Sequence, residues 1–152
     1  MKKLASVLRL DFLPASSDAG LLVLRLWLGL SLLILHGWLK LSGFQKMAGS
    51  FFDPLKIGHR NSLTLSTIGE VVCPILIVLG VFTRLGALGS AINMAVAFTM
   101  MHHLKLSGTG SGELAYVYLC GFVVILIAGP GRFALDGKAA KSGSRRPKPA
   151  HD

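Results

Sequence analysis

Acidic residues and cysteines are both scarce in this chain. Its 152 residues include 7 Asp and Glu against 16 Lys and Arg, and only 2 are cysteines. Cys73 and Cys120 both lie in apolar stretches and form no C-x-x-C pair, which gives no support to a disulfide framework or a self-contained thiol relay. We interpret both cysteines as small apolar core residues. Charged residues make up 15% of the chain. This is too few to give each helix of a soluble four-helix protein its own polar face.

Hydrophobic residues, by contrast, account for 52% of the chain. They gather in four long runs, at about residues 21–41, 62–82, 85–104 and 113–129. The hydrocarbon core of a bilayer is about 30 Å thick, and a helix that crosses it needs about 20 mostly apolar residues. The sequence therefore predicts an all-α, polytopic membrane protein, folded as a bundle of four transmembrane helices.

Residues 1–18 have the pattern of a short amphipathic helix that lies on the membrane surface. Charged residues interrupt the apolar core that a signal peptide would need, whereas the apolar residues of the segment would share one helix face. Ser16, Ser17 or Asp18 can cap the first span. The transmembrane domain is then expected over residues 19–136.

Basic residues lie mostly outside the apolar runs, where they report topology rather than nucleic-acid binding. The two ends of the chain and the short loop near Arg84 carry more of them than the other two loops. This bias predicts that both termini lie in the cytoplasm. We expect the chain to be a multi-pass protein of a bacterial-type cytoplasmic (inner) membrane. Residues 137–152 are expected to form a basic, disordered tail that is attracted to anionic lipid.

The first span carries its polar residues on a single face. Arg25, Gly29, Leu32, His36 and Lys40 follow one another at helical spacing. Because ionised groups are costly in a bilayer, we expect this face to point into the bundle.

Ionisable residues from the other spans are predicted to lie at the same level as His36. Successive spans run antiparallel and rise about 1.5 Å per residue. Six ionisable residues are therefore expected in the half of the membrane away from the termini: His36, Lys40, Glu70, His102, His103 and Glu113. Lys40, His103 and Glu113 could instead extend to the lipid headgroups. For His36 and Glu70, a structural hydrogen bond and a ligand or proton site remain equal alternatives. No pair has ligand spacing such as H-x-x-x-H, so we predict no metal site.

Other residues of the spans are typical of helix packing. Small residues on the third span would let helices approach closely, and the polar one among them could hydrogen-bond across the contact: Gly86, Gly89, Ser90, Asn93 and Ala97. Pro74, one turn after Glu70, removes a backbone hydrogen bond and should distort the second span. At the other end of the bundle, we expect Asp136 to form a structural ion pair with Arg25 or Arg132.

Several short motifs, taken in order, resemble the DoxX family of membrane proteins. They are LRL at 24–26, GWLKL at 37–41, GE at 69–70, LGVFTR at 79–84 and GPGRFALD at 129–136. The resemblance extends over about residues 20–136 and implies a four-helix membrane bundle. It draws attention to Arg25, Lys40, Glu70 and Asp136.

The family resemblance also implies an association with redox chemistry. Some members are subunits of a thiosulfate–quinone oxidoreductase, and others are membrane partners of soluble thiol and superoxide enzymes. This chain has no flavin, haem or iron–sulfur motif, so the sequence names no cofactor, and a quinone is one candidate that the resemblance offers. The expected partners are membrane lipid and other membrane or soluble redox subunits, and a homo-oligomer is also compatible.

Three functional hypotheses follow. The first is a membrane subunit or partner of a quinone- or thiol-linked redox system, in which Lys40 or His36 binds a quinone carbonyl and Glu70 passes a proton. The second is a non-catalytic anchor or assembly subunit of a larger membrane complex. The third is a small-molecule transporter, which is less favoured because the chain has no internal repeat.

Overall fold

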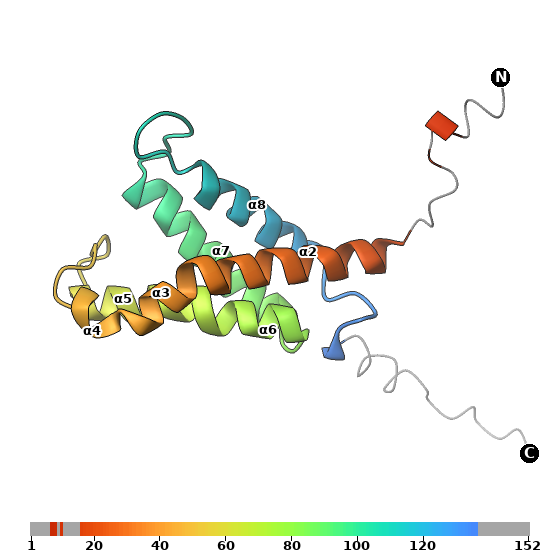
Figure 1. The fold of residues 1–152 in the computed structure, drawn as a ribbon, viewed down its shortest axis with the longest axis horizontal. Helices are drawn as coiled ribbons and strands as arrows, with labels where there is room; N and C mark the ends of the chain where they lie inside the picture. The colour runs from red at the N-terminus through yellow and green to blue at the C-terminus, as the bar shows by residue number, and fades with distance from the viewer. Residues whose placement is uncertain (1–6, 9, 11–15, 137–152) are drawn as a thin grey trace, which may run out of the picture.

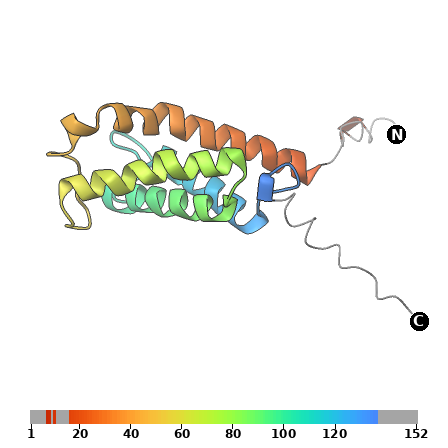
Figure 2. The same cartoon turned by 90° about the horizontal axis from the view of Figure 1, so that it is seen from below.

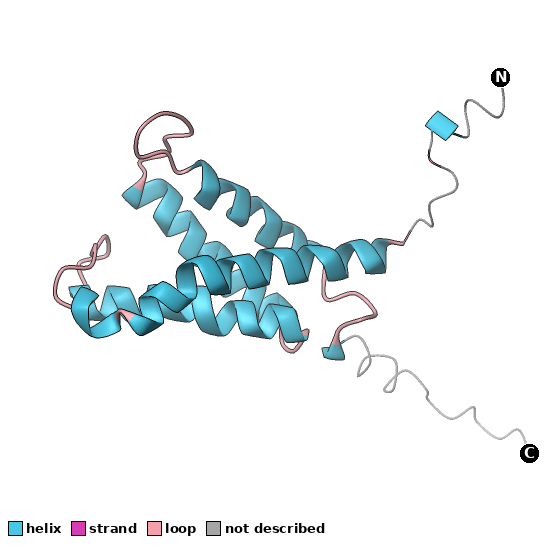
Figure 3. Cartoon of the chain, in the orientation of Figure 1, coloured by secondary structure: helices cyan, strands magenta, loops and turns pink. Residues whose placement is uncertain are grey.

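The structure is a computed structural model and describes residues 7, 8, 10 and 16–136. Most of the predicted amphipathic segment 1–18 and all of the predicted tail 137–152 lie outside the described residues. Within the described part of the chain, the secondary structure is helical and includes no strand (Figure 3). Three of its helices are long and apolar enough to cross a membrane.

The first long helix covers Ser17–Ser42 and has 26 residues. It consists of three consecutive elements, α2 (Ser17–Leu32), the π-helical turn η1 (Leu33–Gly37) and α3 (Trp38–Ser42). Ser16 caps it, because its Oγ accepts a hydrogen bond of 3.2 Å from the Ala19 amide, which confirms the predicted cap. A short helix, α4 (Phe44–Met47), follows.

The second long helix covers His59–Leu79 and has 21 residues. Its elements are α5 (His59–Thr67), the π-helical turn η2 (Ile68–Val72) and α6 (Cys73–Leu79). It ends at Gly80, whose left-handed φ of 74° gives the sharp turn into the third helix.

The third long helix covers Thr83–Met101 and has 19 residues. It consists of α7 (Thr83–Val96) and the π-helical turn η3 (Ala97–Met101), so it ends three residues before the predicted boundary at 104. The last helix, α8 (Glu113–Ala128), is apolar but has 16 residues. At 1.5 Å per residue its length is about 24 Å, less than the hydrocarbon thickness of about 30 Å.

The helices run back and forth along a common long direction (Figure 1). Two connections, at residues 43–58 and 102–112, lie at one end of the bundle, which we call the loop end. The start of α2 and residues 129–136 lie at the opposite end, which we call the tail end. The long helix from α2 to α3 packs along α6 and α8, and α7 packs most extensively on α8 (Figure 2).

The face of the first helix that was predicted to point inward does so. Arg25, Gly29 and Leu32 are buried, and His36 and Lys40 are partly buried. The 3.6-residue spacing therefore located the interior face correctly along all of the helix.

The small residues of α7 allow the close approach that the sequence predicted. A Cβ atom added to Gly86 would lie 2.8 Å from the Cys73 carbonyl oxygen, and one added to Gly89 would lie 2.5 Å from the Cys73 sulfur. Ser90 Oγ donates a hydrogen bond of 2.9 Å to the Gly69 carbonyl. The second and third helices are thus in direct backbone contact beside η2.

Each of the three long helices contains a π-helical turn, and η1 and η2 contact each other. Pro74 follows η2 and has no N–H to donate to the Glu70 carbonyl four residues before it. That carbonyl lies against Gly37 in η1, where any added Cβ atom would collide with it. The approach of the first two helices at this level therefore requires a glycine at position 37.

We predict that Gly37→Ala lowers the free energy of unfolding by about 1–3 kcal/mol, because the methyl group would overlap the Glu70 carbonyl. Gly20→Ala is the matched control, since an added Cβ atom at Gly20 meets nothing within 4 Å. Unfolding in mixed detergent micelles measures both variants. Equal stability of the two would show that the contact between η1 and η2 is not tight.

Candidate functional site

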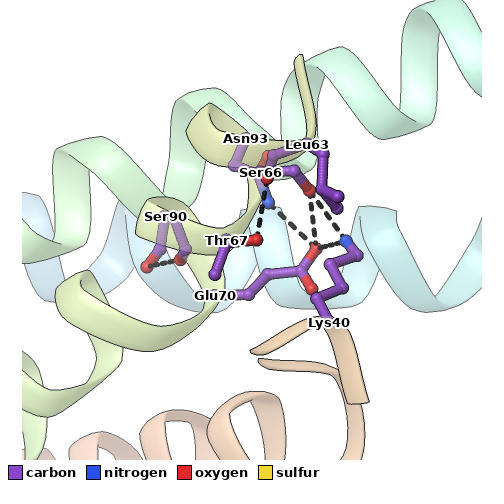
Figure 4. A network of polar contacts seen from close by, with 8 residues as sticks. Lys40, Leu63, Ser66, Thr67, Glu70, Ser90 and Asn93 are labelled. Carbon is purple, nitrogen blue, oxygen red and sulfur yellow. Dashed lines mark hydrogen bonds and ion pairs between the residues drawn. The ribbon is translucent and has the colours of Figure 1, made fainter. Parts of the chain in front are cut away.

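A buried carboxylate, Glu70, joins three of the helices. The residue is 4% exposed, and its Oε1 atom accepts three hydrogen bonds. The donors are Lys40 Nζ at 2.5 Å, Asn93 Nδ2 at 3.1 Å and Ser66 Oγ at 3.4 Å (Figure 4). Lys40 comes from α3, Asn93 from α7 and Ser66 from α5, so the carboxylate is held between separate segments of the chain. The hydrogen bond across helices predicted for Asn93 is confirmed.

The other carboxylate oxygen, Glu70 Oε2, is buried and has no hydrogen-bond partner among the described residues. An unpaired buried acceptor costs about 1–3 kcal/mol. A proton, a water or a bound molecule can complete the bonding of such an atom. One oxygen of the Glu70 carboxylate thus accepts three hydrogen bonds and the other accepts none from the described residues. This arrangement suits a group that binds a ligand or transfers a proton.

Lys40 is directed inward and does not extend to the headgroups, which excludes that alternative for this residue. Its ammonium group also donates to Ser66 Oγ at 2.7 Å and lies 5.5 Å from the centre of the Phe51 ring. The Lys40 side chain is 21% exposed. Lys40–Glu70 is the one ion pair within 4.0 Å among the described residues, and it balances the charge of the buried carboxylate.

A cavity of about 310 Å³ lies on one side of this ion pair, and we call it the apolar cavity. Lys40 and Glu70 supply its charged groups, and Ser62, Ser66 and Asn93 add polar ones. The rest of its wall comprises Phe51, Phe52, Pro54, Leu55, Leu65, Ile68, Gly69, Cys73, Gly89, Ile92, Val96, Ala97 and Met101. This composition, a mostly apolar wall with a few polar groups at one place, is typical of small-molecule sites.

A second cavity, of about 390 Å³, lies between the first helix, η3 and α8, and we call it the histidine cavity. It shares Lys40 and Glu70 with the apolar cavity. Its remaining wall comprises Leu32, His36, Met94, Ala97, Met101, His102, Ser111, Leu114, Ala115 and Tyr118. The structure thus brings four of the predicted site residues, His36, Lys40, Glu70 and His102, to one cavity.

His36 is partly buried and contacts an aromatic residue that the sequence analysis did not include. Its ring meets that of Tyr118 edge-on, with centroids 6.0 Å apart. The Tyr118 hydroxyl donates to Ser31 Oγ at 2.8 Å. The hydrogen bond considered between His36 and Glu70 is not present; the side chains that bond the carboxylate are Lys40, Asn93 and Ser66.

His102 lies where η3 ends, at the loop end of the bundle. Its Nδ1 atom is 2.9 Å from the Gly110 carbonyl oxygen. Because a carbonyl oxygen can only accept, Nδ1 must carry the proton, and Nε2 is left to accept one. Gly112 packs so tightly on His102 that a Cβ atom there would lie 2.6 Å from the histidine Cβ. The loop therefore fixes the position of the imidazole.

Two predicted members of the polar group do not reach the cavities. His103 and Glu113 are exposed, and neither contributes to the wall of the apolar or the histidine cavity. Within the described residues, no group of three or more His, Cys, Asp or Glu side chains could hold a metal ion.

At the tail end, the predicted ion pair between Asp136 and Arg25 or Arg132 is not formed within 4.0 Å. Asp136 instead caps α7, accepting from the Phe82 amide at 3.1 Å and from Thr83 N and Oγ1 at 2.8 and 2.9 Å. The physical reason is that the first amides of a helix have no partner of their own. Desolvation raises the pKa of the Asp136 carboxyl, but these hydrogen bonds and the charge of Arg25 together outweigh it and hold the pKa below its usual value.

Arg25 is the most deeply buried charge at that end, with 1% exposure. Its Nε and Nη1 atoms have no hydrogen-bond partner among the described residues, and the guanidinium packs against Gly80 and Ala134. Arg132 lies elsewhere: its amide donates to Asp18 at 2.9 Å, and its guanidinium lies over the Phe133 ring. The residues 129–136 thus close the tail end through backbone and capping contacts.

Sequence comparisons show that the chain matches a protein family and is similar to a bacterial protein. The family model described as DoxX matches residues 20–103. An uncharacterized protein of Haemophilus influenzae is 32% identical over 117 residues, which cover 71% of this chain and 82% of that protein. No solved structure matches the chain.

We predict that Lys40→Met lowers the free energy of unfolding by about 3 kcal/mol, because it leaves the buried Glu70 carboxylate without a cation. Adding Glu70→Gln to this variant should restore part of the loss, since the buried group is then neutral. Lys46→Met, an exposed lysine of α4, is the control. A full additive loss in the double variant would contradict a coupled pair.

We further predict that Asp136→Ala destabilises the protein by about 1 kcal/mol at neutral pH, through loss of the α7 cap. The pKa of this carboxyl is lower in the folded state, so its contribution is complete above the unfolded pKa of about 3.9 and is lost as pH falls through the folded value. The stability difference between wild type and variant should accordingly begin to decrease below about pH 4 and disappear only below the folded pKa of Asp136. A difference that persists there would point to another role.

Proposed function

Because the chain belongs to the DoxX family, we propose that it is the membrane subunit or partner of a redox system and binds a quinone in the apolar cavity. The observation that carries this proposal is the buried carboxylate of Glu70, which has an oxygen without a hydrogen-bond partner among the described residues and contributes to the wall of a largely apolar cavity. A ligand that satisfies both features has an apolar body and a polar edge. Quinones have this form.

The polar groups match both redox forms of such a ligand. The Lys40 ammonium can donate to a quinone carbonyl, and Glu70 Oε2 can accept from a quinol hydroxyl. A bound quinone would supply two-electron, two-proton chemistry, while the chain's own residues would bind its edge and hold a proton at Glu70. The volume of about 310 Å³ lies at the lower end of the range for small-molecule pockets.

The aromatic and aliphatic wall explains how the rest of the ligand would be accommodated. Phe52, Leu65 and Ile92 are exposed on the bundle and also contribute to the cavity wall. In a membrane, exposed apolar residues of this kind contact lipid tails. An isoprenoid chain could therefore leave the cavity directly into the bilayer, and the ring alone would need to fit inside.

The proposal also places the protein in the membrane. Apolar helices and the family identify a multi-pass membrane protein. We propose that α8 crosses together with the three longer helices, with residues 129–136 completing its path to the headgroups. Both termini would then lie in the cytoplasm of a bacterial-type inner membrane, and the cavities would lie in the half of the bilayer away from it.

Ligand binding should be measured first, with short-chain quinone and quinol added separately to the purified protein. A ligand that binds only the folded state raises the unfolding temperature as its concentration increases. We predict that quinol stabilises the wild type and that Glu70→Gln weakens quinol binding about tenfold, as expected when a hydrogen bond to a charged acceptor is lost. Quinone binding should weaken less, because Lys40 remains.

Two further variants make the result specific. Ile92→Trp should weaken both ligands by filling the apolar cavity while leaving the ion pair intact. Glu113→Gln changes an exposed carboxyl outside both cavities and should have no effect. If neither ligand shifts the unfolding of the wild type at any concentration, the quinone site is wrong, and a non-catalytic anchor of a membrane complex is the remaining interpretation.

A further inference from the structure

We propose that the histidine cavity is a proton route, through which Glu70 exchanges protons with the loop end of the bundle and not with the tail end. The inference deepens the proposed function, since it assigns a direction to the proton that a quinone site would use. Its test does not require a bound quinone.

Glu70 and Lys40 are the charged groups that the two cavities share, beside the apolar Ala97 and Met101. On one side the carboxylate meets a mostly apolar wall, and on the other it meets imidazole, phenol and hydroxyl groups. The apolar cavity adds only the hydroxyls of Ser62 and Ser66 and the Asn93 amide to the ion pair, whereas the histidine cavity adds the imidazoles of His36 and His102 and the phenol of Tyr118. The carboxylate therefore lies at the junction between a place for an apolar ligand and a polar passage.

The polar passage extends to the loop end. Ser111 and His102, both beside the loop of residues 102–112, form part of its wall. The neutral form of His102 must have its proton on Nδ1, which faces the Gly110 carbonyl, so Nε2 can accept a proton and release it again. His36 lies deeper in the same cavity. At about 30 Å³ for each water in the liquid, a volume of 390 Å³ also has room for roughly a dozen waters.

The opposite direction is closed by packed apolar side chains. Leu32 forms part of the cavity wall and is 1% exposed, while Ile77, Phe122 and Ile125 are fully buried. These residues belong to the core of the bundle, between Glu70 and the tail end. A closely packed apolar core holds no chain of proton donors and acceptors.

The titratable groups that face Glu70 come from every helix packed around it. Lys40 is on α3, His36 is on η1, Cys73 is on α6, His102 follows η3 and Tyr118 is on α8; α7 contributes the neutral Asn93.

An apolar carbodiimide, dicyclohexylcarbodiimide, tests this access directly. It takes up the proton of a carboxylic acid at one nitrogen while the carboxylate oxygen bonds to its central carbon, and acyl migration to nitrogen then gives a stable N-acylurea without a leaving group. The initial rate of labelling at Glu70, measured by peptide mass spectrometry, therefore reports the protonated fraction. The labelling is done in right-side-out and in inside-out membrane vesicles, and the pH is changed on one side of the membrane at a time. The comparison identifies the side whose pH determines the protonated fraction of Glu70.

We predict that labelling follows the pH on the loop side, by up to tenfold per unit while the carboxylate is mostly ionised, and does not follow the pH on the tail side. The double variant His36→Phe and His102→Phe, which makes the passage apolar, should reduce this response at least threefold. His103→Phe is the matched control, because His103 is exposed and lies outside the cavity. Retained unfolding temperature shows that the variants are folded.

Labelling that follows the tail side, that is absent at every pH, or that is unchanged in the double variant would overturn the proton route. The outcome is separate from that of the quinone experiment. Labelling that follows loop-side pH in a protein that binds no quinone would support the route and reject the ligand.

Discussion

The ion pair and the hydrogen bonds of one buried carboxylate determine how the helices are arranged in the loop-end half of the bundle. A charged group inside a membrane protein is stable only with a partner and hydrogen bonds. Glu70 obtains both from the first and third helices, through Lys40 and Asn93, and a further hydrogen bond from Ser66 on its own helix. Those helices must therefore approach closely, and the glycine at position 37 and the small residues of α7 are what permit it. The cavities on either side follow from this arrangement, because Lys40 and Glu70 form a wall between them.

Much of this could be predicted from the sequence, and the reason is geometric. Regular helices place residues at fixed spacing and rise, so the inward face of the first helix and the common level of His36, Lys40, Glu70 and His102 could be worked out without coordinates. Asn93 was identified correctly because a polar residue in a stripe of small ones has few partners other than the neighbouring helix.

What was not predicted depends on contacts between segments or on departures from regular geometry. Asp136 was expected to bind an arginine, but the unpaired amides at the start of α7 are its partners, and only the path of residues 129–136 brings them together. Tyr118 was missed because its role depends on how α8 is rotated. The apolar cavity was missed because it forms between helices. The π-helical turns η1 and η3 were missed because no local sequence signal marks them, whereas Pro74 indicated a distortion beside η2.

The three π-helical turns have a consequence for how the bundle can vary. One residue of an α-helix corresponds to a rotation of about 100°, so each added residue in a turn reorients everything beyond it relative to everything before it. η1 and η2 thereby separate the tail-end halves of the first two helices from their loop-end halves, and η3 ends the third helix beside the cavities. Related chains could gain or lose a residue at these turns, turning new side chains toward the cavities while the closed tail half keeps its packing unchanged.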